Sequence, residues 1–339
     1  MSGGRPSFCT PQAEGRRSAI HGSSARVRVL GEALVDLVAA TGAHTYTAHP
    51  GGSPANVAVD LARLGVPVTF HGRIGRDAFG HMLRDHLTDN DVDVAGVVTA
   101  SEPTTIAVAT VDEAGVAHFD FWTAGTANWQ WRPGELPDRL PEDTVALHTG
   151  SLAAWLAPSS EHVAALLARE HGRARVTLSL DPNCRPDLMG NLEEALAWIE
   201  HLVGLVDVVK VSQDDLRWVL PGRSPEQAAE RWLALGPALV VVTLGGDGAY
   251  CLTRSGASAA VTAMTVEVAD TIGAGDAFTA GLLAGLYRAN LLGPGTRAIG
   301  DLAPSALREL LANAAVVAAL TCSRPGAEGP TAAEIRTRR

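Results

Sequence analysis

The chain has 339 residues, of which 46% are hydrophobic and 19% charged, so it has the composition of an ordinary globular protein. Its formal net charge is −10, which disfavours nucleic acid and anionic membranes as partners. The longest apolar runs, such as 238–244, are far shorter than the roughly 20 residues that span a bilayer, and 1–25 lack the apolar core of a secretory signal, so we expect a cytoplasmic protein with no membrane-spanning helix.

The first part of the chain is expected to alternate strands and helices behind a disordered tail. Residues 1–25 are rich in Gly, Ser and Arg and show no periodicity, which is typical of a disordered segment. Apolar residues then recur at strand or helix spacing. The pattern predicts strands at 27–30 and 66–72 and helices at 54–64 and 77–89.

Two β-rich segments interrupt this alternation. Residues 38–49 read as a short ribbon, and 105–111 and 116–122 read as a hairpin with a turn at 112–115. Because an isolated ribbon is marginally stable in water, we expect these segments, about 38–49 and 101–125, to form a lid. Phe119, Phe121 and Trp122 would supply its apolar surface, which predicts a homodimer joined through the lid.

The rest of the chain returns to strand–helix alternation. Residues 239–244 form a continuous apolar run, as expected for a strand covered on both faces. Repeated strand–helix units predict an α/β fold, with a doubly wound, mainly parallel sheet flanked by helices over 26–331 and a tail at 332–339. The other predicted strands are 145–149, 176–180 and 206–211, and the other helices are 160–171, 192–202, about 275–289 and 305–320.

The sharpest chemical signal is a Gly-rich turn at 270–281 that opens into an apolar helix. Its backbone N–H groups could face an anion at the helix N-terminus, without a P-loop lysine. Asp276 follows the turn, and a carboxylate beside phosphate-binding amides is unfavourable unless it handles a proton. The alternative is a simple capping aspartate.

A second signal precedes the helix at 54–64. Gly51 and Gly52 would let a small ligand approach closely, and Asn56 offers a donor and an acceptor to a hydroxyl. Asp36 follows the first strand, near the sheet edge where doubly wound folds bind ligands. By themselves, the glycines and Asn56 would also suit an ordinary turn and helix start.

Together, the segments 51–58 and 270–276 resemble the ribokinase/fructokinase family of carbohydrate kinases, the phosphofructokinase-B type, over about 27–330. The segments 181–186 and 209–216 are similar to those of bacterial fructokinases. The resemblance implies a ribokinase-like fold and ATP-dependent phosphorylation of a sugar hydroxyl, with fructose or a related ketose as the expected substrate.

Three alternatives stay open. The acid substrate of a 2-keto-3-deoxygluconate kinase would favour a cationic lid, and a nucleoside kinase would favour an aromatic sandwich, for which Trp122, Trp129 and Trp131 are available. A non-catalytic sugar-sensing protein on the same fold is an alternative of another class. The intact turn ending in Asp276 argues against it.

The resemblance also implies a role for each matching residue. Asp276 would be the catalytic base, the backbone of Gly273, Ala274 and Gly275 the anion hole, and Arg185 a group near the transferring phosphate. The sugar would contact Asp36, Gly51, Gly52 and Asn56. The nucleotide would contact Lys210, Ser212, Thr243, Gly245, Gly248 and Asn313.

Metal ions are implied in the same way. Mg²⁺ would accompany ATP and be held mostly through water, with Asp215 at a position where the family has a longer glutamate. A potassium ion would bind, mainly through backbone carbonyls, at Asp270, Ile272, Thr321, Arg324 and Gly326. Pro330 stands where ribokinases often have a serine oxygen, so a potassium requirement is an open expectation.

Overall fold

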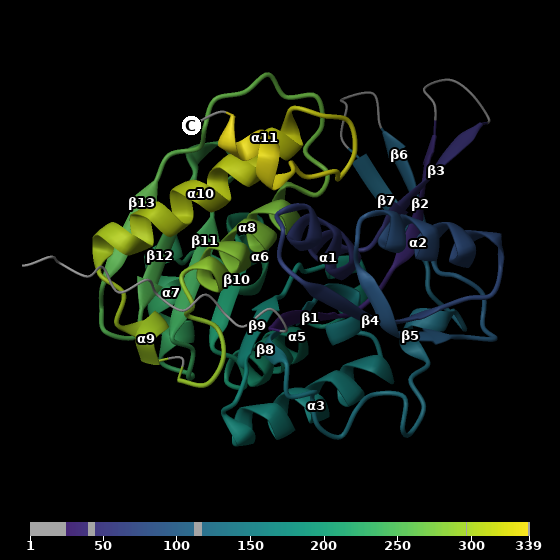
Figure 1. The fold of residues 1–339 in the computed structure, drawn as a ribbon, viewed down its shortest axis with the longest axis horizontal. Helices are drawn as coiled ribbons and strands as arrows, with labels where there is room; N and C mark the ends of the chain where they lie inside the picture. Colours follow the sequence, from purple (N-terminus) through teal and green to yellow (C-terminus); the bar gives the residue numbers. More distant parts are fainter. Residues whose placement is uncertain (1–24, 40–44, 112–116, 296, 338–339) are drawn as a thin grey trace, which may run out of the picture.

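The computed structural model describes residues 25–337 except 40–44, 112–116 and 296, so nearly all of the expected N-terminal tail and the turn at 112–115 lie outside it. Within this part, nine strands form one sheet in the order β13-β12-β11-β10-β9-β8-β1-β4-β5 (Figure 1). The strands from β11 to β5 are parallel, and β12 and β13 extend one edge antiparallel. The expected α/β class with a mainly parallel sheet is confirmed.

The strands of this sheet are β1 (Arg26–Leu30), β4 (Val68–Ile74), β5 (Asp93–Thr99), β8 (Thr144–Gly150), β9 (Thr177–Asp181), β10 (Val208–Ser212), β11 (Leu239–Thr243), β12 (Ala249–Thr253) and β13 (Ser258–Val261). The helices are α1 (Ser53–Arg63), α2 (Ala78–Asp89), α3 (Ser159–Arg173), α4 (Pro186–Met189), α5 (Leu192–Val203), α6 (Gln213–Val219), α7 (Pro225–Leu233), α8 (Ala274–Arg288), α9 (Arg297–Gly300), α10 (Pro304–Cys322) and α11 (Ala332–Arg336). Short 3₁₀ turns are η1 (Ala127–Trp129), η2 (Ser151–Ala154) and η3 (Gly245–Asp247).

Helices cover both faces of the sheet because its strands are apolar on both faces. Along β11, Leu239 and Val241 pack with α8 and α10, whereas Val240 and Val242 pack with α3, α5 and α7. Successive strand residues point to opposite faces, so each strand supplies both hydrophobic cores. Strands β5, β12 and β13, which the sequence analysis did not predict, complete the two edges.

A second sheet of four strands, in the order β3-β2-β6-β7, lies at the upper right of Figure 1. It contains β2 (Leu34–Ala39), β3 (Tyr46–Gly51), β6 (Ile106–Val111) and β7 (Ala117–Trp122). Both expected lid segments are therefore joined in one sheet. The first begins at Leu34, four residues before its expected start, because Leu34 and Val35 are buried and continue directly from the turn after β1.

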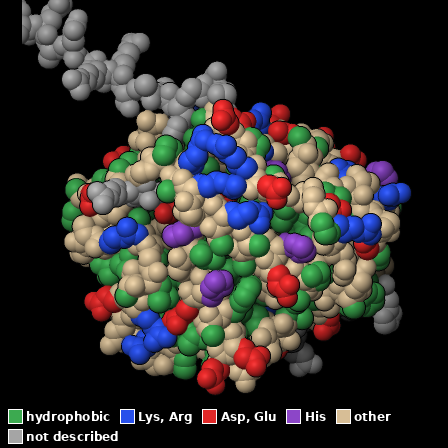
Figure 2. Space-filling view, turned by 90° about the horizontal axis from the view of Figure 1, so that it is seen from below, with side chains coloured by type: hydrophobic (Ala, Val, Ile, Leu, Met, Phe, Trp, Pro, Cys, Tyr) green, Lys and Arg blue, Asp and Glu red, His purple; other side chains and the backbone are tan. Residues whose placement is uncertain are grey.

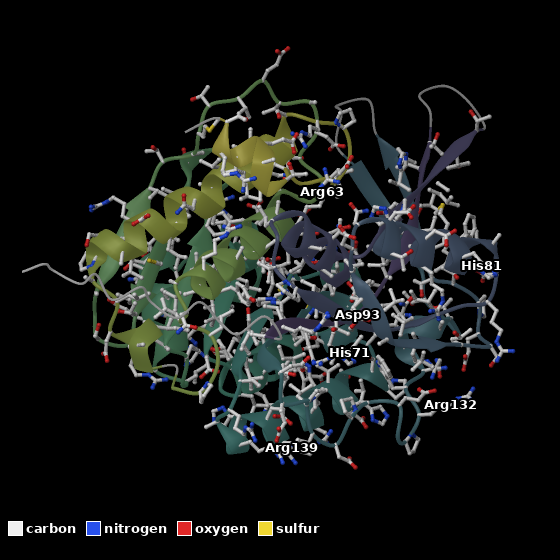
Figure 3. All side chains as sticks on the ribbon, viewed as in Figure 1. Arg63, His71, His81, Asp93, Arg132 and Arg139 are labelled. Atoms are coloured by element: carbon white, nitrogen blue, oxygen red, sulfur yellow. The ribbon has the colours of Figure 1, made fainter. Side chains whose placement is uncertain are left out.

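The end of the described chain is held to α1. Arg63, which is labelled in Figure 3, donates to the carbonyl of Gly329 at 2.8 Å, and Asp60 accepts the N–H of the same glycine at 3.0 Å. The segment expected to be a tail then begins with α11, which Thr331 and Glu334 cap reciprocally. Within the described residues, the expected C-terminal tail at 332–339 therefore begins as a short capped helix.

One described helix, α10, is long and apolar enough to cross a membrane by length and composition alone, contrary to the expectation of none. It packs against α8 and the β13 edge of the sheet, which explains its apolar composition without a membrane. On the face seen in Figure 2, acidic and basic side chains are interspersed, so the negative net charge does not form one continuous acidic surface there.

A buried ion pair joins β9, β10 and α8 below the first turn of α8. Lys210, the only lysine, lies 2.8 Å from Asp181 Oδ2, and the two side chains are only 5% and 3% exposed. Thr279 donates to the same oxygen at 3.3 Å. Burial alone would lower the pKa of Lys210, but the charge and hydrogen bond of Asp181 raise it, so the lysine stays protonated.

We predict that Asp181→Asn lowers the free energy of unfolding by about 3–5 kcal/mol, because it leaves the Lys210 charge buried without a counterion. Urea unfolding at pH 7 measures this. The matched control is Asp214→Asn, which breaks the exposed pair of Asp214 and Arg217 and should leave stability close to wild type. Equal stability of the two variants would contradict the prediction.

Candidate active site

Two cavities meet at the N-terminus of α8. One, of about 320 Å³, lies between the β1–β2 turn, α1 and η2, and we call it the inner cavity. The other, of about 580 Å³, runs between the ends of β10 and β11 and α10, and we call it the groove. Asn183, Thr271 and Gly275 line both. The two cavities are therefore neighbours at this helix end.

The turn before α8 has the geometry of an anion site. Gly273 has a φ of 74°, and a Cβ there would lie 2.5 Å from the Cβ of Ala327, so the position requires glycine. The first-turn N–H groups of α8 and the helix dipole give this end a partial positive charge. A Cβ on Gly275 would lie 3.0 Å from Lys210 Nζ, which places the buried ammonium directly beside the turn.

Asp276 is held in the wall of the inner cavity by two residues of α1. Ser53 Oγ donates to its Oδ1 at 2.6 Å, and Asn56 Nδ2 donates to its Oδ2 at 2.9 Å. Burial raises the pKa of Asp276, and these two hydrogen bonds partly oppose that rise. The result is a carboxylate of fixed orientation and increased basicity, with Ser53 as a partner that the sequence analysis missed.

The sugar-site residues expected from sequence come together around this carboxylate. Asp36, Gly52 and Asn56 line the inner cavity. Gly51 is buried behind Asp36, and a Cβ there would lie 2.1 Å from Asp36 Oδ2, so the glycine makes room for the carboxylate. Burial raises the pKa of Asp36 to about 6, with Arg185 opposing the rise and Asp276 adding to it.

Arg185 is the one cationic side chain among the described residues that line the inner cavity. Its Nη1 donates to Asn183 Oδ1 and to the Cys184 carbonyl, both at 2.8 Å. Glu32, which the sequence analysis did not select, lines the same cavity, and so does Phe121, which was expected only to supply apolar surface to the lid. The inner cavity therefore holds the three carboxyl groups of Glu32, Asp36 and Asp276 around one guanidinium.

The expected nucleotide residues gather along the groove, with one exception. Those in its lining are Lys210, Ser212, Thr243, Gly245 and Gly248, together with Ala274 and Asp215. Ser212 and Asp215 cap α6 reciprocally, and Asp215 Oδ1 also accepts the Cys184 N–H at 3.0 Å. Burial, followed by the Asp181 charge, raises the pKa of Asp215.

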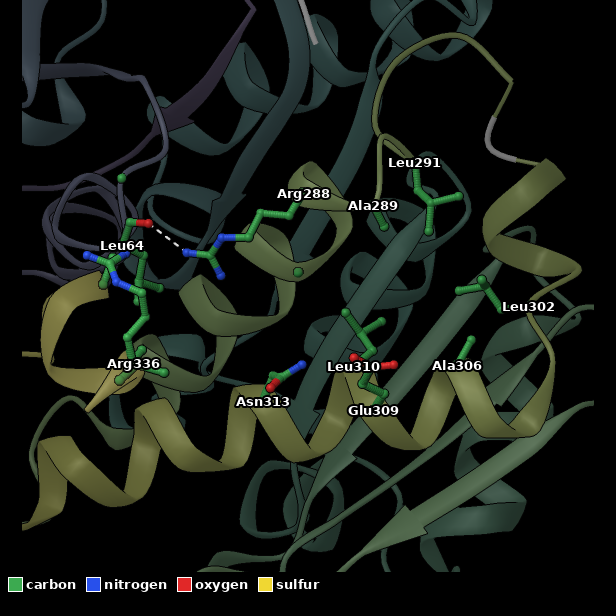
Figure 4. Close-up of a pocket in the computed structure, with 14 residues that line it drawn as sticks. Leu64, Arg288, Ala289, Leu291, Leu302, Ala306, Glu309, Leu310, Asn313 and Arg336 are labelled. Atoms are coloured by element: carbon green, nitrogen blue, oxygen red, sulfur yellow. Dashed lines mark hydrogen bonds between the residues drawn. The ribbon is translucent and has the colours of Figure 1, made fainter. Parts of the chain in front are cut away.

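Asn313 is the exception, and its expected place in the adenine pocket is corrected. It lines a separate cavity of about 670 Å³ between α8, α10 and α11, with Leu310 and Arg336 (Figure 4). On an α-helix a residue two positions from Ala315 points about 160° away from it. Since α10 faces the groove with Ala315, Ala318, Ala319 and Cys322, Asn313 faces the other side.

The residues expected to hold a monovalent cation lie on two adjoining loops. Asp270 accepts the N–H of Ile272 at 3.0 Å through Oδ1 and that of Gly326 at 2.9 Å through Oδ2. The Arg324 N–H donates to the Thr321 carbonyl at 3.1 Å. In the part of the chain that the structure describes, no cluster of three His, Cys, Asp or Glu side chains could hold a metal.

The chain is similar to known proteins over most of its length. The family model for pfkB family carbohydrate kinases matches residues 24–334. A fructokinase of Rhizobium leguminosarum bv. trifolii is 36% identical over 281 residues, which cover 82% of this chain and 84% of that protein.

Two solved structures are also similar. The fructokinase of Xylella fastidiosa with bound ATP has a TM-score of 0.83 and 30% identity, covering 92% of this chain and 97% of that one. A double mutant of the Vibrio cholerae O395 fructokinase, solved with fructose, ADP and a potassium ion, has a TM-score of 0.77 and 31% identity, covering 90% and 94%. On these matches, the chain belongs to the pfkB family of carbohydrate kinases.

Proposed function

We propose that this chain is an ATP-dependent fructokinase that phosphorylates a hydroxyl of fructose or a related free ketose. The observation that carries the proposal is the meeting of two cavities at the N-terminus of α8, with Asp276 facing the inner one. Sugar in the inner cavity and ATP in the groove would bring hydroxyl and γ-phosphate together there. ATP as the phosphoryl donor also favours a cytoplasmic site of action.

Asp276 would accept the proton of the attacking hydroxyl. Its two hydrogen bonds from α1 fix the carboxylate, and its raised pKa makes it a better base than an exposed aspartate. The backbone of Gly273, Ala274 and Gly275 would stabilise the charge on the transferring phosphoryl group, with Lys210 close by. Phosphoryl transfer needs mainly such positioning and charge stabilisation.

The charge of the inner cavity favours a neutral polyhydroxyl substrate. Glu32, Asp36 and Asp276 can accept hydrogen bonds from hydroxyls, but they repel the carboxylate of a ketodeoxy acid. A nucleoside would favour a stacking partner on each side of its base, yet Trp129 and Trp131 are buried in the hydrophobic cores. Phe121 alone brings an aromatic ring to this cavity among the described residues.

Magnesium and potassium ions would bind close to the two cavities. Mg²⁺ bound to ATP would neutralise phosphate charge, and Asp215, already engaged with Cys184 and α6, would reach it through water. The loops held together by Asp270 are a candidate potassium site. The potassium ion in the Vibrio cholerae structure supports this part of the proposal.

We predict that Asp276→Asn lowers kcat by at least about 10²-fold, because the amide cannot accept the proton. ADP release with fructose measures turnover, and calorimetry should show nearly unchanged ATP binding. Asp207→Asn is the control, since Asp207 accepts the Leu178 N–H at the opposite end of the sheet and should keep wild-type turnover. Near wild-type kcat in Asp276→Asn would refute the base assignment.

A screen of other acceptors separates the remaining candidates. Fructose, 2-keto-3-deoxygluconate and nucleosides are offered in the same ADP-release assay. Turnover of only the acid or only a nucleoside would replace the fructokinase proposal with that alternative. Sugar binding without ADP release from any acceptor would indicate the non-catalytic sensor.

The lid sheet has an exposed aromatic face, which supports a homodimer. Neighbouring side chains on each of its strands point to opposite faces of the sheet. On β7, Phe121 lines the inner cavity, while its neighbour Trp122 points away and is 64% exposed. Tyr46 of β3 is also exposed on this sheet. A second copy of the lid could cover these aromatic rings while the inner face stays with the sugar.

We predict that sedimentation velocity at micromolar concentration shows a dimer, and that Trp122→Glu shifts it to monomer without unfolding. Leu235→Glu, a similar change at an exposed leucine after α7, should leave the dimer intact. A wild-type monomer both with and without fructose would contradict the lid interface.

A further inference from the structure

Glu32 is a buried carboxyl group in the inner cavity that takes no part in the proposed proton and phosphoryl transfer. Glu32 lies at the turn between β1 and β2 and is only 1% exposed. Glu32 Oε2 accepts the N–H of Ala153 at 3.1 Å, and the Ser151 hydroxyl donates to the same carboxyl group. These bonds fix the start of η2, where Ser151 has a left-handed φ of 54°.

From Ser151 the hydrogen bonds continue to the cavity's guanidinium. Asn183 Nδ2 donates to Ser151 Oγ at 3.3 Å, and Arg185 Nη1 donates to Asn183 Oδ1 at 2.8 Å. Asn183 also has a left-handed φ, of 43°. A polar chain thus runs from Glu32 to Arg185 across the ends of β8 and β9, and all four side chains line the inner cavity.

Packing alone does not account for a carboxyl group at this position. Burial raises the pKa of Glu32 to about 7, against the weaker opposing effects of its hydrogen bonds and of Arg185. A raised pKa means that the folded state holds the proton more tightly than the unfolded chain, so ionising Glu32 costs stability as pH rises through 7. A neutral glutamine would fill the same space without that loss of stability. The negative charge of Glu32 therefore has a role other than stabilising the fold.

We propose that Glu32 is a positioning residue for sugar binding, which fixes the Ser151 turn and, through Ser151 and Asn183, holds Arg185 in place in the inner cavity. This inference rests on the proposed sugar phosphorylation. Arg185, at the start of α4, acts on the charges of Glu32 and Asp36, and Asp276 on α8 also acts on Asp36. Arg185 acts on Asp215 as well. When Glu32 is protonated, Arg185 loses one of these three countercharges.

The first test compares kinetics across pH 5.5 to 8.5 for the wild type and Glu32→Gln. In the wild type, KM for fructose should rise as pH falls through about 7. In Glu32→Gln it should be about tenfold higher at pH 8 and should not titrate near 7, with kcat and the KM for ATP little changed. Urea unfolding at pH 8 should show equal or greater stability, which a purely structural role would not give.

The matched control is Glu170→Gln. Glu170 of α3 is also nearly fully buried and accepts a backbone N–H, that of Leu140 at 3.2 Å, but it lies outside both cavities. It should keep the wild-type KM and pH profile. If Glu32→Gln behaves like this control while the wild type phosphorylates fructose, the Glu32 inference is wrong; a wild type inactive on every acceptor would instead refute the proposed function.

A double-mutant cycle tests the route through Arg185. In an Arg185→Ala background, Glu32→Gln should have little further effect on KM, because its target is already removed. Equal effects in both backgrounds would overturn the positioning role. Ser151→Ala removes the hydroxyl that links Glu32 to Asn183, so it should also raise the KM for fructose. If Glu32→Gln does not fold, this variant tests the positioning role in its place. Calorimetric fructose binding gives the same comparison without turnover.

Discussion

The ion pair of Lys210 and Asp181 sets the position of nearly everything else in the site. Loss of either side chain would destabilise the fold, because the other would remain as an uncompensated charge among buried strands. Thr279 ties the pair to α8, so the first turn of that helix is anchored over the ends of β9 and β10. The two cavities meet above this anchor, and Gly275 has no side chain because Lys210 Nζ occupies the nearby space.

The linings of the two cavities differ mainly in their backbone and cationic groups. Three carboxyl groups and one arginine surround the inner cavity, which suits hydroxyls. The groove also carries three carboxyl groups, those of Asp214, Asp215 and Asp247, but it adds two cations, Lys210 and Arg217, and a run of glycine backbone. Under the proposed reaction, the phosphates would be held by cations and backbone N–H groups at this helix end, and the neutral sugar would lie among the carboxyl groups of the inner cavity.

Sequence reasoning succeeded where the signal is local and failed where it depends on packing. The apolar run of β11 and the Gly-rich turn before α8 each lie within a few residues. Ser53 was not predicted as a site residue, because its hydrogen-bond partner, Asp276, lies 223 positions away in the sequence. The sequence could not show which face of α10 Asn313 occupies, since that depends on the packing of α8. Edge strand β5 carries partly exposed residues and lacks the apolar run that marks β11.

The short stretch of backbone from β1 into β2 links the nine-stranded sheet to the lid sheet and passes along the inner cavity. Glu32 is bound to the body through Ala153, whereas Asp36 lies on β2, which pairs with β6 of the lid. The N–H of Val35 donates to the Thr105 carbonyl at 3.1 Å, which adds to the pairing of β2 with β6 just before Asp36. A movement of the lid would carry Asp36, one of the three carboxylates that act on Arg185, relative to Glu32 and Asp215. Under the proposed function, lid position and sugar recognition would therefore be coupled through this arginine, because Asp36 lies on a strand of the lid sheet, whereas Glu32 is hydrogen-bonded to η2.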